Sequence, residues 1–156
     1  MKYVVLAIVI ALAVFYFTRN SNNKKLAVEN IAIGKDFLAT NKTAEGVSET
    51  ASGLQYLVLQ KGDGTSNPSA RSKVKVHYHG SLLDGTVFDS SVNRGEPISF
   101  ALNQVISGWT EGVQLMVVGD KFRFFIPSNL GYGNGSAGQI TPGSMLIFEV
   151  ELLEIK

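Results

Sequence analysis

Alternation of apolar and polar residues runs through the last two-thirds of the chain and constrains the fold more than any other feature. Residues 73–80 read KVKVHYHG, so Val74, Val76 and Tyr78 would share one face of a strand, opposite two lysines and two histidines. Related patterns mark residues 54–60, 97–102, 121–127 and 145–155. Strands with one apolar face are typical of an antiparallel sheet with one face in water.

One segment among these strands has helical spacing instead. In residues 105–119, VISGWTEGVQLMVVG, the apolar residues Ile106, Trp109, Val113 and Met116 recur on one helical face. We expect Gly119 to end this helix in a left-handed conformation. A one-sided sheet with a single short helix predicts an α+β fold, in which the sheet curls around the helix.

The first residues form a hydrophobic run that does not fit a soluble core. Tyr3 to Phe17 are 15 consecutive apolar or aromatic residues, preceded by Lys2 and followed by Arg19. As a helix they would span roughly 22 Å. Because no small-residue cleavage site follows, residues 1–18 are interpreted as a signal-anchor or transmembrane helix in preference to a cleaved signal peptide.

The segment between this run and the strands has a different composition. Residues 19–50 are expected to form a polar linker with a short helix: a polar hinge at 19–25, a helix over 26–42 with Leu26, Ile33, Phe37 and Leu38 at roughly helical spacing, and small polar residues from 43 to 53. Gly34 weakens the helix prediction. The strand pattern then places a single domain over residues 51–156.

Several kinds of chemistry are disfavoured by composition. The chain has no cysteine and a net charge of +1, which argues against thiolate chemistry, cysteine-ligated zinc and a nucleic-acid partner. His77 and His79 are the only histidines and share the lysine face, so we expect them to point to solvent and not to bind metal. Neither a GxSxG motif nor a phosphate-binding pattern around GYGNGSAG is present. No cofactor is expected.

Aromatic residues are the remaining candidates for a site. Tyr78 and Tyr132 each carry a hydroxyl that needs a partner when buried. Such hydroxyls in an apolar pocket are typical of a site for a small molecule or a peptide side chain. The full candidate set is Tyr78, Phe88, Phe100, Trp109, Phe124, Tyr132 and Phe148, of which Phe124 is interpreted as core.

Several motifs, in order from about Leu54 to Lys156, resemble FKBP-type peptidyl-prolyl cis-trans isomerases. They are VHYHGSLLDGTVFDSS, RGEPISF, QVISGWTEGVQLMVVGDKFRFFIP, LGYG and ITPGSMLIFEVELLEI. ASGLQYLVLQKGDG and GKDFLATN are similar to the bacterial macrophage-infectivity-potentiator-like branch. Members of that branch carry a long helical N-terminal dimerisation region, for which only residues 26–42 are expected to be available here.

The resemblance implies a fold and an activity, and the hydrophobic run adds an expected location. The fold would be an antiparallel β-sheet half-barrel wrapped around one short helix, after an N-terminal hydrophobic helix. The activity would be isomerisation of X-Pro bonds in exported proteins; the alternative is a non-catalytic prolyl-peptide-binding chaperone or envelope scaffold. The domain would face the periplasm from the inner membrane, anchored through residues 3–17, or would be periplasmic and soluble after cleavage.

The resemblance also implies a site. Trp109 would form the pocket floor, the Ile106 N–H and the Tyr132 hydroxyl would bind peptide carbonyls, and Asp89 would orient Tyr78 and Arg94. Proline-containing polypeptides and macrolide immunosuppressants would be ligands, with Ile98 and Thr141 departing from residues common in the family. The implied catalytic residues are Tyr78, Phe88, Asp89 and Tyr132, and the implied substrate-binding residues are Arg94, Phe100, Val105, Ile106, Trp109, Ile140 and Phe148.

Overall fold

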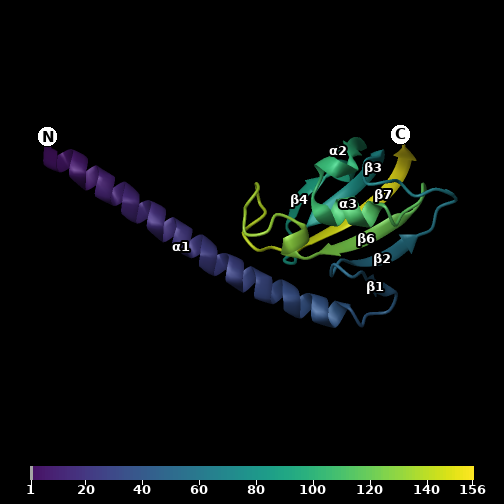
Figure 1. Cartoon of the computed structure of the whole chain (residues 1–156), viewed down its shortest axis with the longest axis horizontal. Helices are drawn as coiled ribbons and strands as arrows, with labels where there is room; N and C mark the ends of the chain where they lie inside the picture. Colours follow the sequence, from purple (N-terminus) through teal and green to yellow (C-terminus); the bar gives the residue numbers. More distant parts are fainter. Residues whose placement is uncertain (1) are drawn as a thin grey trace.

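A long helix precedes a curled sheet in the computed structural model, which describes residues 2–156, with side chains from residue 10 onward. Figure 1 shows the helix projecting from the sheet domain toward the N-terminus. The elements are α1 (Lys2–Asn41), β1 (Val47–Glu49), β2 (Gln55–Gln60), β3 (Lys73–Ser81), β4 (Val87–Ser90), α2 (Ser91–Arg94), β5 (Ile98–Ala101), η1 (Leu102–Gln104), α3 (Ser107–Val113), β6 (Lys121–Ile126), η2 (Ser128–Leu130) and β7 (Leu146–Ile155).

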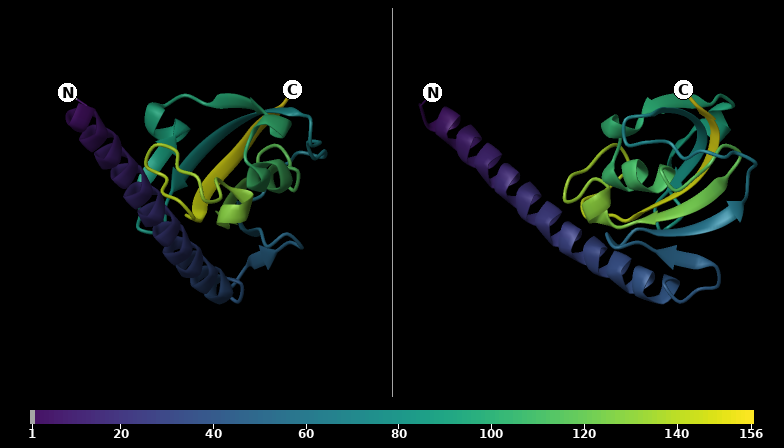
Figure 2. Two further views of the ribbon diagram at one scale, coloured as in Figure 1. Left: turned by 60° about the vertical axis from the view of Figure 1, so that its left-hand side comes forward. Right: turned by 45° about the vertical axis from the view of Figure 1, so that its right-hand side comes forward.

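The seven strands form one sheet with the order β1-β2-β6-β7-β3-β4, and β5 also pairs with β3. All neighbouring strands are antiparallel. The sheet curves around α3, as both views in Figure 2 show. The predicted α+β fold is therefore confirmed.

The core lies between the concave face of the sheet and α3. The period of two along β3 places Val74, Val76 and Tyr78 in this core, and β6 and β7 contribute every second residue in the same way. Trp109 and Val113 of α3 pack against them. The strand alternation read from the sequence thus identifies the inward residues of the central strands.

The helix around Trp109 is shorter than predicted. α3 ends at Val113, and a turn follows in which the Leu115 N–H donates to the Gly112 carbonyl at 3.0 Å. Met116 stays in the core although it is not helical. Gly119 has the expected positive φ of 96° but belongs to the turn before β6, where its N–H donates to the Leu152 carbonyl.

Two short strands were not predicted. β1 lies within the segment expected to be a linker and pairs with β2, from Val47 opposite Leu57 to Glu49 opposite Gln55. β4 pairs with the end of β3 and carries Phe88 and Asp89. Both strands are too short for an alternating pattern, so their pairing partners decide their conformation.

The expected hinge at residues 19–25 is wrong, because α1 continues through it without a break. This stretch contains neither proline nor glycine, the two residues that most strongly interrupt a helix. The described side chains from Ile10 to Lys25 are exposed. No helix in the part of the chain with described side chains is long and apolar enough to cross a membrane. Residues 1–9 of the predicted anchor lie outside that part.

The C-terminal half of α1 docks on the outer side of the sheet domain. Its contact face runs through Ala27, Gly34 and Phe37 at helical spacing, and the Phe37 ring lies 5.9 Å from the Phe125 ring. Gly34 was expected to weaken the helix, but α1 continues through it, and Gly34 is buried beside Met145. Ile33, which was assigned to the apolar face, is exposed.

Buried polar side chains fix the end of α1 to the sheet. Gln55 is only 1% exposed; its side-chain amide donates to the Leu38 carbonyl and the Glu49 carboxylate, both at 2.9 Å. Its carbonyl accepts from the Asn41 amide at 2.9 Å. Because these groups are all paired, burying them costs little and fixes one helix register.

Candidate active site

A cavity of about 610 Å³ opens on the concave side of the sheet, between α3 and the loop that follows η2. Its walls come from β3, β4, β5, β7, α3 and that loop. The lining residues are Tyr78, Phe88, Asp89, Phe100, Gln104, Val105, Ile106, Trp109, Tyr132, Ala137, Gly138, Gln139, Ile140 and Phe148.

Trp109 lines this cavity and is 4% exposed. Three rings meet it edge to face: Phe148 at 5.3 Å, Tyr78 at 5.4 Å and Phe100 at 5.6 Å between centroids. Edge-to-face contact sets the positive edge of one ring against the negative face of another and fixes their relative orientation. The wall around Trp109 is therefore an apolar surface of interlocked rings.

Gly80 allows two rings of the wall to approach β3. A Cβ at this position would lie 2.7 Å from atoms of both Phe88 and Phe148. Those two rings pack edge to face, with centroids 5.3 Å apart. The glycine after the VHYH sequence is thus required by close packing beside the cavity.

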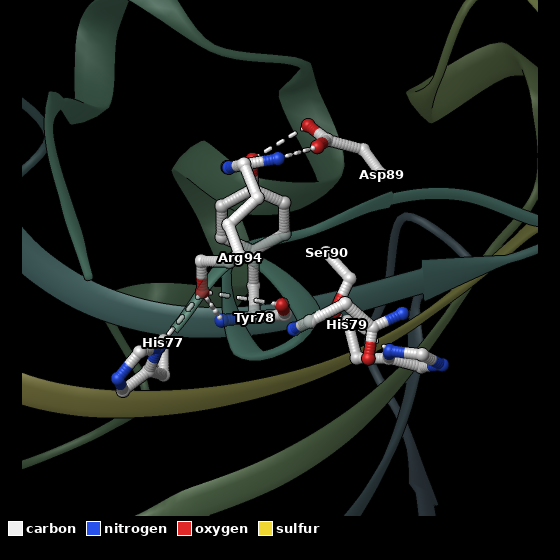
Figure 3. Close-up of polar contacts among 8 residues, drawn as sticks. His77, Tyr78, His79, Asp89, Ser90 and Arg94 are labelled. Atoms are coloured by element: carbon white, nitrogen blue, oxygen red, sulfur yellow. Dashed lines mark hydrogen bonds and ion pairs between the residues drawn. The ribbon is translucent and has the colours of Figure 1, made fainter. Parts of the chain in front are cut away.

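A polar triad borders the apolar cavity. The Tyr78 hydroxyl donates to Asp89 Oδ2 at 2.5 Å, and Arg94 donates from Nη1 to Asp89 Oδ1 at 2.5 Å and from Nη2 to the Tyr78 oxygen at 3.0 Å (Figure 3). The Arg94 guanidinium carbon also lies 5.8 Å from the centroid of the Tyr78 ring. Each member therefore bonds the other two, which holds the Asp89 carboxylate in one orientation at the cavity.

The triad moves the pKa values of its members away from neutrality. Burial raises the pKa of Tyr78, and the hydrogen bond to Asp89 acts in the same direction. Burial disfavours ionised Asp89, but hydrogen bonds from Tyr78 and Arg94 outweigh it and lower the pKa of the carboxyl. The hydrogen bonds to Tyr78 and Asp89 raise the pKa of Arg94. The site thus holds a neutral phenol, an anionic carboxylate and a cationic guanidinium.

Comparison with known proteins gives a consistent result. A model of the FKBP-type peptidyl-prolyl cis-trans isomerase matches residues 64–153, and a model of the domain amino-terminal to such isomerases matches residues 8–58. The chain belongs to the FKBP-type peptidyl-prolyl cis-trans isomerase family. The resemblance inferred from the motifs is confirmed.

Individual relatives show how much of the family architecture this chain shares. It is 59% identical over 132 residues to the isomerase FkpA of Aeromonas hydrophila, covering 85% of this chain and 49% of that protein. The outer membrane protein MIP of Legionella longbeachae is 43% identical over 139 residues, 88% of this chain and 59% of that protein. The crystal structure of FkpA from Escherichia coli superposes with a TM-score of 0.85 at 40% identity, covering 94% of this chain and 70% of that one.

The chain spans about half the length of the curated relatives that it matches. The N-terminal region is longer than we expected, because the family match begins at residue 8 and α1 extends from Lys2 to Asn41.

The residues implied by the FKBP resemblance come together at one place. Ten of the eleven line the cavity, and Arg94 is joined to it through Tyr78 and Asp89. Ile106 precedes the first turn of α3, and Tyr132, which is 44% exposed, lines the cavity from the loop that follows η2. Their roles toward a substrate remain predictions.

Sequence reasoning missed part of the cavity wall. Gln104, Ala137, Gly138 and Gln139 line it as well. The last three lie in a loop closed by paired hydrogen bonds between Ala137 and Ile140. The sequence could have indicated these loop residues, because the glycine-rich run lies between the LGYG and ITPG motifs of the family.

The interpretation of the two histidines needs correction. They do share the outer face of β3, but they are half-buried and not free in solvent. His79 Nδ1 lies 2.9 Å from Ser90 Oγ (Figure 3). His77 Nδ1 lies 2.9 Å from Ser91 Oγ. Among the described residues, no group of three or more His, Cys, Asp or Glu side chains could hold a metal ion.

Proposed function

We propose that this chain accelerates cis–trans isomerisation of X-Pro bonds in polypeptides, with the proline ring seated over Trp109. The observation that carries the proposal is the aromatic cavity with one held carboxylate at its edge. Cavities of this size that combine apolar walls with a few polar groups suit a small ligand or a few residues of peptide.

The chemistry requires no nucleophile. Rotation about a prolyl bond has a barrier of about 18–20 kcal/mol because it interrupts amide resonance. The planar amide is more charge-separated than the twisted amide, so an apolar pocket disfavours the ground state relative to the transition state. Each ~1.4 kcal/mol of such differential stabilisation gives a factor of ten in rate.

The polar groups would supply orientation. Ile106 and Tyr132 both line the cavity, and the Ile106 N–H and the Tyr132 hydroxyl would donate to peptide carbonyls that flank the proline. Asp89 would present its fixed carboxylate to the twisted amide. Holding the flanking backbone while the central bond turns is what separates a catalyst from a binding module.

The test is an isomerisation assay on the full chain with a proline-containing peptide. We expect faster cis–trans exchange, measured as NMR exchange at equilibrium. Peptide binding to the cavity without faster exchange would instead support the alternative function, a non-catalytic prolyl-peptide-binding chaperone.

We propose that the chain acts in the cell envelope on exported polypeptides. The name of the Legionella longbeachae relative, an outer membrane protein, supports an envelope location. Residues 3–17 would anchor the chain in the inner membrane with the cavity facing the periplasm. Full-length protein should then stay with membranes after high-salt washing, and a chain beginning at Lys24 should not. Recovery of mature protein that begins beyond residue 17 would favour a cleaved signal.

We also propose macrolide immunosuppressants as ligands of the same cavity. The aromatic walls support this, while Ile98 lies where some family members carry an aromatic residue and Thr141 where many carry a proline. Quenching of Trp109 fluorescence, in competition with a proline peptide, measures the affinity.

A further inference from the structure

Strand β3 has a gap along one edge at the residue that carries the site's phenol. On that edge β5 pairs with residues 73–76 and β4 with residues 79–81. Neither strand reaches Tyr78, whose backbone N–H and carbonyl would otherwise be unpaired there. An unpaired backbone group in a buried setting is costly, so something must take the place of the missing strand.

The Ser91 side chain fills this gap. The Tyr78 N–H donates to Ser91 Oγ at 2.8 Å, and the Ser91 hydroxyl donates back to the Tyr78 carbonyl at 3.3 Å. Ser91 is fully buried, so water is not available to replace it. The Ser91 hydroxyl thus makes the two hydrogen bonds to the Tyr78 backbone that a neighbouring strand would otherwise make.

The direction of the Ser91 hydroxyl hydrogen depends on the tautomer of His77. The Ser91 hydroxyl has one hydrogen to donate, and its oxygen already accepts from the Tyr78 N–H. If that hydrogen goes to the Tyr78 carbonyl, the contact with His77 Nδ1 at 2.9 Å requires a proton on Nδ1. If Nδ1 were unprotonated, it would accept the Ser91 hydroxyl hydrogen, and the hydrogen bond to the Tyr78 carbonyl would be lost.

Residues 89–94 therefore hold Tyr78 both by its hydroxyl and by its backbone. Asp89 and Arg94 bond the phenol oxygen (Figure 3). Ser91, which lies between them in sequence, bonds the peptide groups of Tyr78. A shift of Ser91 would move the Tyr78 backbone relative to the two groups that hold its hydroxyl. Displacements of about 1 Å in such a site can cost about 100-fold in rate.

We infer that Ser91 and His77 are positioning residues of the isomerase site. His77, carrying its proton on Nδ1, orients the Ser91 hydroxyl, and Ser91 holds the peptide of Tyr78 so that its phenol meets Asp89 and Arg94. The effect on turnover rests on the proposed function; the effect on Tyr78 geometry does not.

His79 provides a matched control. Its Nδ1 also lies 2.9 Å from a serine of the same segment, but that serine, Ser90, caps α2 by accepting from the Asn93 N–H and does not bond Tyr78. His77→Ala and His79→Ala thus each remove one histidine–serine contact from the same strand face. Only His77→Ala should change the position of the Tyr78 phenol.

The first experiment is NMR on the full chain at pH 8.5. We expect the His77 ring nitrogens to show protonated Nδ1. His77→Ala should shift the Tyr78 Cζ resonance and speed exchange of the Tyr78 amide by about tenfold or more. His79→Ala should leave both unchanged. His77→Asn, whose side-chain amide can donate from nearly the same place, should restore both signals.

The second experiment is turnover of a proline peptide. We expect kcat/KM to fall about threefold to tenfold for His77→Ala and at least as much for Ser91→Ala, with recovery in His77→Asn and no change in His79→Ala. A bare Nδ1 on His77, or equal effects of the two histidine variants on Tyr78, would overturn the inference. An inactive wild-type chain would overturn the proposed function, while the NMR signals would still decide this inference.

Discussion

At the scale of single residues, the site depends on a charge arrangement built around one phenol. Tyr78 is 4% exposed, yet its hydroxyl donates to Asp89 and accepts from Arg94. A buried hydroxyl needs such partners, and two charged partners of opposite sign satisfy it without leaving a net charge in the wall. Asp89 is thereby presented to the cavity in a fixed orientation.

We expect Asp89→Ala to lower kcat/KM by about tenfold or more, because the carboxylate is lost and Tyr78 and Arg94 lose their common acceptor. The melting temperature should change little, since the carboxylate is partly exposed. Asp84→Ala is the control, because Asp84 is exposed and caps the Thr86 N–H outside the cavity. Undiminished turnover in Asp89→Ala would contradict the assigned role.

Phe88→Ala should reduce turnover while destabilising the fold less than a core substitution does. Phe88 lines the cavity and packs on one side against Phe148. Truncating a fully buried phenylalanine such as Phe124 costs about 3–5 kcal/mol, and we expect Phe88→Ala to cost about half of that or less. Thermal unfolding of the two alanine variants, alongside kcat/KM of Phe88→Ala, checks this.

Catalysis should be nearly independent of pH, with kcat/KM varying less than about threefold between about pH 6 and 8.5. The pKa of Asp89 is lowered from its ordinary value of 3.8, and the pKa of Tyr78 is raised from 10.0. The stability that ionised Asp89 contributes is therefore present above about pH 5 and lost as the pH falls through the lowered pKa. The contribution of neutral Tyr78 is lost only as the pH rises above 10.0. A bell-shaped profile near neutrality would contradict this.

At the scale of elements, α1 supports the loop that forms one wall of the cavity. The Asn30 side-chain amide donates to the Pro142 carbonyl at 2.9 Å and to Thr141 Oγ1 at 3.1 Å. Gly143 lies directly against the Ala27 backbone and donates its N–H to the Gly133 carbonyl, which ties the two ends of the loop together. Residues Ala137 to Ile140 of this loop line the cavity.

Gly143→Ala should destabilise the protein more than Gly95→Ala. Both glycines have nearly the same left-handed φ, 75° and 74°, so both substitutions carry a similar backbone strain of about 1–2 kcal/mol. Only at Gly143 would the new Cβ meet backbone, 2.4 Å from the Ala27 carbonyl oxygen; at Gly95 the space is open. Equal free energies of unfolding for the two variants would show that α1 does not press on this loop.

At the scale of the whole molecule, the exposed and docked parts of α1 differ in what they contribute. The described residues from Ile10 to Lys25 lie free of the sheet domain, whereas the segment from Ala27 to Asn41 covers Phe125, Met145 and Gln55. Figure 2 shows this docked part running along the underside of the domain. The stable unit is therefore the sheet domain together with the second half of the helix.

A chain that begins at Lys24 should melt within about 1 °C of the full-length protein, because it keeps every contact of the docked segment. A chain that begins at Thr43 should melt at least about 5 °C lower, because Phe125 and Met145 become exposed. Its kcat/KM should also fall, since the cavity loop loses its support from α1. Equal melting temperatures and equal turnover for the two chains would contradict this division.

The fold class and most of the residues that line the cavity could be predicted from the sequence. Alternation along β3, β6 and β7 identified the core side chains, because a period of two on a one-sided sheet leaves few alternatives. The spacing around Trp109 located α3, and the family motifs indicated the residues that line the cavity. These features are local or recur in fixed order, so they can be read along the chain.

Features that depend on a partner distant in sequence could not be predicted from local patterns. β1 and β4 are strands because β2 and β3 pair with them, and α1 continues through Gly34, which packs beside Met145. The alternation assigns His77 and His79 to the solvent-facing side of β3. In the structure, each forms a hydrogen bond with a serine more than ten positions away in the segment beside the site. Alternation predicts which face of the strand a side chain lies on, but only the folded chain shows which residues it contacts there.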